Sequence, residues 1–106
     1  MLTDGAIVVA DRSEAGRILC SRRRCAAFGY LLSIGGFAER EPAGFRNCRT
    51  RLRLVFEDAE TPEEGGPTSA DVERIVEFAR RVDLATGKVL VQCQAGISRS
   101  AAAHLF

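Results

Sequence analysis

Short runs of apolar, often β-branched residues recur along this chain and alternate with segments of helical periodicity. Four runs have the length and residue types of strands, at positions 6–9, 30–34, 51–56 and 88–92. Glycine, proline and charged residues predict loops at 35–50 and 57–67. Strands that alternate with helices and have mostly apolar cores predict an α/β fold with a largely parallel central sheet flanked by helices.

Helix start signals follow the first and the third of these runs. Asp11 with Glu14 three residues later predicts an N-cap and its reciprocal partner, and Thr68 with Asp71 predicts another. After the second start, apolar residues recur at the helical interval, at Val72, Ile75, Val76, Ala79 and Val82. The arginine run at 22–24 is expected to be a solvated helix end or loop.

The length and the charge balance narrow the class of protein. A chain of 106 residues is enough for one domain and too short for two, so we expect a single domain over 1–106. Lys and Arg number 15 against 14 Asp and Glu, which argues against a nucleic-acid partner bound through bulk charge. No apolar stretch approaches the roughly 18 residues of a membrane span, and the N-terminus lacks a signal-peptide pattern. We therefore expect a cytoplasmic protein without a membrane partner.

The cysteines and the single histidine argue against a metal site. The four cysteines are irregularly spaced without a CxxC pair, and His104 is the only histidine, so we expect no metal and no cofactor. In a reducing cytoplasm the thiols are free. Cys20, Cys25 and Cys48 are interpreted as structural or incidental, which leaves the reactivity of Cys93 as the question.

The segment from Val89 to Ala103 carries the strongest chemical signal. A buried strand leads into Cys93, a short loop with Gly96 ends in Arg99, and small residues that can start a helix follow. The backbone amides of such a loop, backed by a helix N-terminus, can hold a dianion with three oxygens. Arg99 adds a planar fork for two phosphate oxygens. The same electric field favours the thiolate form of Cys93, which is the nucleophilic form.

The combination of strand, CxxGxxRS loop and helix start resembles the cysteine-dependent protein tyrosine and dual-specificity phosphatases, most closely their compact bacterial members. The resemblance covers the strand "KVLVQC" and the loop "CQAGISRS". Upstream, "LLSIGG", "RLRLVFEDAE" and "TSADVERIVEFA" are similar to that family's first sheet strands, general-acid loop and following helix. Nearly the whole chain is covered, although only the loop is a specific motif.

The resemblance implies a role for each residue that matches the motif. Cys93 is the nucleophile that forms a phosphocysteine, Arg99 binds the phosphate and its transition state, and the Ser100 hydroxyl stabilises the departing thiolate. The aspartate that follows the central strand in that family corresponds to Asp58, which acts first as general acid and then as general base. The residues of the phosphate-binding loop are Gln94, Ala95, Gly96, Ile97, Ser98 and Arg99.

Some of these residues have other interpretations, and the sequence departs from the family pattern at two places. Cys93 can be a buried core thiol at the end of an apolar strand, and Arg99 can be a surface arginine at a helix end. Asp58 can be a solvated carboxylate of an acidic loop, and Ser100 can be only a helix cap. Glu57 and Glu60 are less favoured substitutes for the acid. Gln92 stands where the family usually has a histidine that helps to fix the loop and tune the thiol. The chain ends at Phe106, so we expect a truncated domain without the family's C-terminal helices.

These observations predict a phosphatase that acts on phosphotyrosine-type monoesters, with phosphoserine and phosphothreonine esters as further candidates. The loop side chains other than Arg99 carry no positive charge, which favours a phosphorylated protein or a small phosphomonoester over a highly charged inositol phosphate. The chief alternative is a catalytically impaired, phosphate-binding pseudophosphatase or a truncated fragment. An enzyme of the arsenate-reductase type is a third option. In the small phosphatases related to those reductases the nucleophile loop lies near the N-terminus, whereas in this sequence it lies at the other end.

Overall fold

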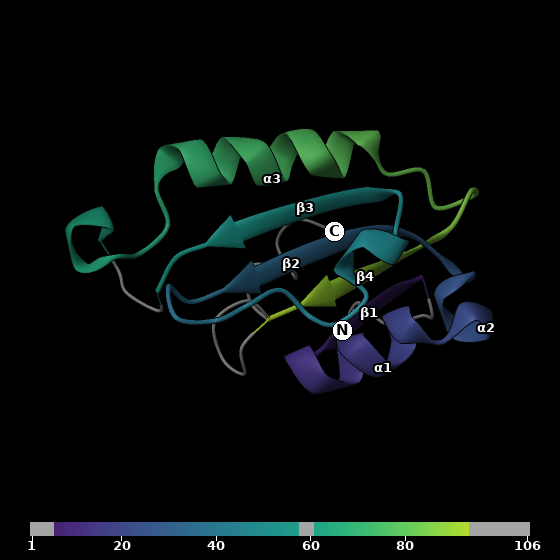
Figure 1. Cartoon of the computed structure of the whole chain (residues 1–106). Coiled ribbons are helices and arrows are strands. Elements are labelled where there is room, and N and C mark those ends of the chain that lie inside the picture. The colour runs from purple at the N-terminus through teal and green to yellow at the C-terminus, as the bar shows by residue number, and fades with distance from the viewer. Residues whose placement is uncertain (1–5, 58–60, 94–106) are drawn as a thin grey trace.

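Residues 6–57 and 61–93 are described by a computed structural model (Figure 1). Within these residues the chain alternates strands and helices, as the sequence predicts. In chain order the elements are β1 (Ile7–Ala10), α1 (Arg12–Cys20), α2 (Arg22–Cys25), β2 (Phe28–Gly35), the 3₁₀ helix η1 (Phe45–Asn47), β3 (Thr50–Val55), the 3₁₀ helix η2 (Pro62–Glu64), α3 (Ser69–Arg81) and β4 (Lys88–Gln92).

The four strands form one sheet in which every described pair is parallel. Their order is β1-β4-β2-β3, so β4 is an interior strand between β1 and β2. The chain crosses the sheet in opposite directions from β1 to β2 and from β3 to β4, and crossovers of one hand then place α1 and α3 on opposite faces (Figure 1). The prediction of an α/β fold with a parallel sheet flanked by helices is confirmed.

Two hydrophobic clusters fill the two faces of the sheet. Successive side chains of a strand point to opposite faces, so in β2 Leu31 packs in the cluster with α1, whereas Leu32 packs in the cluster with α3. Both leucines are completely buried. Complete burial of a leucine is worth about 1.5–3 kcal/mol relative to exposure, so these alternating contacts fix which face each helix covers.

The start of α1 follows only half of the predicted capping pattern. Asp11 caps the helix, because its carboxylate accepts a hydrogen bond of 2.8 Å from the Glu14 amide. The Glu14 carboxylate instead accepts hydrogen bonds from Arg17 and Arg24, at 2.8 and 3.1 Å. The arginine run at 22–24 is exposed as predicted, but it forms the short helix α2 of its own rather than the end of α1.

The predicted start of α3 is confirmed, and its predicted apolar face is partly wrong. Thr68 and Asp71 form the complete capping box. Ile75 and Phe78 are the buried residues of the helix, whereas Val72 is 51% exposed. Phe78 packs edge-on against the Tyr30 ring of β2, with the ring centres 6.5 Å apart, and this contact with a strand helps to set the buried face of the helix.

Candidate functional site at the carboxyl edge of the sheet

Cys93 directly follows β4, at the carboxyl end of an interior parallel strand. Its backbone N–H donates a hydrogen bond of 3.1 Å to the Ala10 carbonyl at the end of β1. Ligands of open α/β sheets bind beyond the carboxyl ends of the strands, so this position is the expected one for a functional residue. The Cys93 side chain is 3% exposed and belongs to the cluster on the α3 face. Any substrate of this thiol must therefore gain access to a shielded group.

Glu57 stands at the same edge of the sheet, just after β3. Its carboxylate accepts a hydrogen bond of 2.7 Å from the Phe37 backbone N–H, and its own N–H donates to the Gly65 carbonyl at 2.7 Å. Glu57 thus ties the loops that follow β2 and β3 to each other. This role is structural, and the place of Glu57 as a less favoured substitute for the general acid stays a prediction.

Most of the predicted site falls outside the described residues. The structure places Cys93 and its neighbour Gln92 but describes neither Asp58, Arg99 nor Ser100. The remaining predicted positions outside the described ranges are the acid substitute Glu60 and the loop residues Gln94, Ala95, Gly96, Ile97 and Ser98. Their roles stay predictions from the sequence.

Beside Cys93 the structure contains a buried polar chain that the sequence analysis missed. Ser33 Oγ donates a hydrogen bond of 2.5 Å to Gln92 Oε1, and both residues are buried, with exposures of 0% and 1%. Arg53 Nη1 donates to Ser33 Oγ at 2.8 Å, and Nη2 donates to the Glu39 carbonyl at 2.8 Å. Two sequence signals pointed to these buried polar side chains: a serine within the apolar run LLSIGG and a glutamine at the end of KVLVQ.

The Arg53 guanidinium reaches this position because Gly35 leaves room for it. A Cβ atom at position 35 would lie 2.6 Å from Arg53 Nη2, so any larger residue there would collide with the guanidinium. Desolvation lowers the pKa of Arg53, while Glu41 and Glu39 oppose that change. An arginine nevertheless stays protonated at neutral pH, so the polar chain ends in a positive charge.

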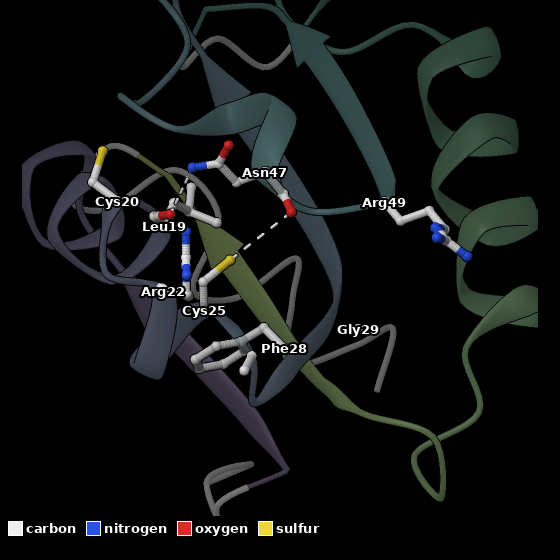
Figure 2. A pocket seen from close by; sticks show the side chains of 9 residues that line it. Leu19, Cys20, Arg22, Cys25, Phe28, Gly29, Asn47 and Arg49 are labelled. Carbon is white, nitrogen blue, oxygen red and sulfur yellow. Dashed lines mark hydrogen bonds between the residues drawn. The ribbon is translucent and has the colours of Figure 1, made fainter.

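Two cavities lie in different parts of the described structure. One of about 680 Å³ is lined by Arg53, Val55 and residues of the loop between β2 and β3. Another of about 540 Å³ lies at the amino ends of β2 and β3, with Cys20 and Cys25 in its wall (Figure 2). Since the strands are parallel, this second cavity is at the opposite edge of the sheet from Cys93.

The three cysteines upstream of Cys93 differ in burial. Cys20 is exposed, Cys25 is half-buried with its sulfur 4.0 Å from the Asn47 carbonyl, and Cys48 is buried beside the carbonyls of Phe28 and Thr50. All are free thiols. Burial raises the pKa of the Cys48 thiol, and Cys25 adds to the rise.

This shift predicts a loss of stability at alkaline pH. Above the unfolded pKa of about 8.5 the unfolded chain releases the Cys48 proton while the folded chain keeps it, so the free energy of unfolding falls until the pH passes the folded pKa. Urea unfolding with reductant at about pH 7 and pH 9.5 should show a smaller fall for Cys48→Ala than for the natural chain. Cys20→Ala, at an exposed position, should keep the natural fall, and an unchanged fall in Cys48→Ala would refute the prediction.

The described part of the chain shows neither a metal-binding cluster nor a membrane-spanning helix. Among residues 6–57 and 61–93, no three His, Cys, Asp or Glu side chains gather as a metal site. Within the same ranges, no helix has the length and apolar character needed to cross a membrane. Compared with family models, curated proteins and solved structures, the chain matches none of them.

Proposed function

We propose that this chain is a cysteine-dependent phosphatase with a protein tyrosine phosphatase-like fold, which hydrolyses phosphotyrosine-type monoesters through a phosphocysteine on Cys93. The observation that carries the proposal is the position of Cys93 at the carboxyl end of the interior strand β4. The CxxGxxRS loop that starts at this cysteine supplies the residue types for holding a phosphate. A thiolate nucleophile also needs reducing conditions, so we propose a cytoplasmic location.

In the first step of the proposed reaction, the Cys93 thiolate attacks phosphorus opposite to the leaving group. The bond between sulfur and phosphorus forms as the bond between phosphorus and the ester oxygen breaks. Asp58 gives its proton to that oxygen, so the product leaves as a neutral phenol or alcohol. Arg99 and the loop amides stabilise the negative charge on the equatorial oxygens.

In the second step, water attacks the phosphocysteine. The Asp58 carboxylate takes a proton from the water as the new bond between oxygen and phosphorus forms. The bond between phosphorus and sulfur breaks, and the electron pair returns to Cys93 as a thiolate that the Ser100 hydroxyl stabilises. Inorganic phosphate leaves, and Asp58 is protonated for the next cycle.

A second candidate function is phosphate binding without turnover. The burial of Cys93 and the presence of Gln92 before it favour this candidate, because a nucleophile must be reached by its substrate and a glutamine cannot carry charge. Such a pseudophosphatase would still bind a phosphoester through its loop. The two functions differ in one observable property, the release of inorganic phosphate.

The test is phosphate release from a phosphotyrosyl peptide and from an aryl phosphate, in the presence of a chelator. The proposed phosphatase should hydrolyse both, with rates that the chelator does not change. Alkylation of the protein with iodoacetamide should stop the reaction and should label the Cys93 peptide, which is read by mass spectrometry. Binding of orthovanadate without any phosphate release would instead support the pseudophosphatase, and activity that needs a divalent cation would overturn the mechanism.

A further inference from the structure

The polar chain beside Cys93 occupies the last complete row of the sheet. Gln92 is in register with Ala10 of β1 and with Ser33 of β2, and Ser33 is in register with Arg53 of β3. The row therefore crosses all four strands, and Cys93 is the residue that directly follows β4. Ser33 and Gln92 lie two residues after Leu31 and Leu90, so they share the α1 face with them, opposite to the Cys93 side chain.

The hydrogen bonds of this row run in one direction towards β4. The charged Arg53 donates to the Ser33 hydroxyl, and that hydroxyl donates to the Gln92 carboxamide oxygen. Within residues 6–57 and 61–93, Ser33 supplies the side-chain hydrogen bond that the Gln92 carboxamide accepts. Because buried polar groups are costly when unpaired, loss of the serine hydroxyl would leave both Gln92 and Arg53 without this partner.

We propose that Arg53, Ser33 and Gln92 form a positioning relay that fixes the end of β4, and with it the backbone of Cys93, for attack on phosphorus. This inference rests on the proposed phosphatase function. The relay acts through the backbone, because the Gln92 side chain is on the other face of the sheet from the thiol. Two neighbouring strands thereby support the neutral amide at position 92, β2 directly through Ser33 and β3 through Arg53.

Kinetics of relay variants on an aryl phosphate test this inference. Ser33→Ala should lower kcat by about 10- to 100-fold, because small misplacements of a reacting group have effects of that size, and it should leave KM within about twofold. Arg53→Met should have a similar effect. The double variant should be no slower than Ser33→Ala, because both changes break one unit. A natural kcat in Ser33→Ala, or fully multiplicative effects in the double variant, would overturn the relay.

The matched control is Tyr30→Phe. The Tyr30 hydroxyl bonds Thr86 Oγ1 at 2.9 Å and accepts from the Asp83 amide at 3.0 Å, in a buried side chain at the amino end of β2. This variant also loses hydrogen bonds of a buried strand side chain, but these join β2 to the loop between α3 and β4, at the edge of the sheet away from Cys93. We therefore expect kcat to stay within about twofold. A fall in kcat equal to that of Ser33→Ala would show a general loss of stability and would overturn the relay.

Amide hydrogen exchange separates failure of the relay from failure of the phosphatase proposal. The Cys93 N–H, which bonds the Ala10 carbonyl, should exchange about tenfold faster in Ser33→Ala than in Tyr30→Phe. This holds whether or not the chain hydrolyses phosphate. If the natural chain is inactive but Cys93 exchanges faster in Ser33→Ala, the phosphatase proposal is refuted, and the relay still fixes the Cys93 backbone. Equal exchange in the two variants would overturn the relay.

Discussion

Cys93→Ser is expected to reduce the hydrolysis of an aryl phosphate by about 10⁴-fold or more, because removing a covalent nucleophile lowers kcat by a factor of this order. The serine is nearly the same size as the cysteine, so it fits the buried position at the end of β4. Its hydroxyl, however, stays protonated at neutral pH and is a poor nucleophile without a neighbouring base. The measurement is kcat/KM for the variant and for the natural chain, purified and assayed in the same way.

The variant should keep its affinity for phosphate, because the anion is held by the loop amides and Arg99 rather than by the thiol. Binding of a phosphotyrosyl peptide to Cys93→Ser therefore reports an intact site. Cys20→Ser, which changes an exposed cysteine at the end of α1, is the matched control and should retain full activity. Normal turnover in Cys93→Ser would exclude the covalent mechanism.

Arg99→Lys is expected to lower kcat/KM by about 10²- to 10³-fold, the range seen when a group that stabilises developing charge is removed. Lysine keeps the positive charge but presents a single ammonium group, so it cannot contact two phosphate oxygens in the fixed geometry of a guanidinium. The loss should be larger in kcat than in KM, because the equatorial oxygens gain charge in the transition state. Steady-state kinetics on the same aryl phosphate give both values.

Arg22→Lys is the control for this exchange, since Arg22 is an exposed residue of α2 beside the cavity at the opposite edge of the sheet from Cys93. It should leave kcat/KM unchanged. If Arg99→Lys behaves like Arg22→Lys, then Arg99 is a surface residue at a helix start and the phosphate site is not formed by this loop.

The sequence predicted the elements of the fold because their signals are local. The four apolar runs are the four strands, and the capping box of α3 is formed by the expected pair, Thr68 and Asp71. Hydrogen bonds between residues three positions apart depend on neither strand order nor register. The alternation of strands and helices was also sufficient for the parallel sheet, since parallel strands require crossover connections.

Contacts between residues far apart in the sequence depend on strand order and packing, and these contacts were not predicted. Ser33 and Gln92 are 59 positions apart, and they meet because β2 and β4 are neighbours in that register. Glu14 lost its expected capping role to arginines, one of which is contributed by α2. The position of Cys93 at the end of a strand was predictable, and a buried thiol there was one of the two interpretations of this residue. Which face of the sheet buries it depends on packing between elements that the sequence pattern does not specify.

The central claim is that phosphate is transferred to Cys93, and a direct test is to trap that intermediate. Ser100→Ala should slow the second step, because the departing thiolate loses a hydrogen bond, so the phosphocysteine should accumulate. The variant is mixed with an aryl phosphate, quenched within the first turnovers and digested, and its peptides are analysed by mass spectrometry. We predict a phosphate on the Cys93 peptide, absent from Cys93→Ser treated in the same way. Steady phosphate release with no adduct on Cys93 would contradict the account.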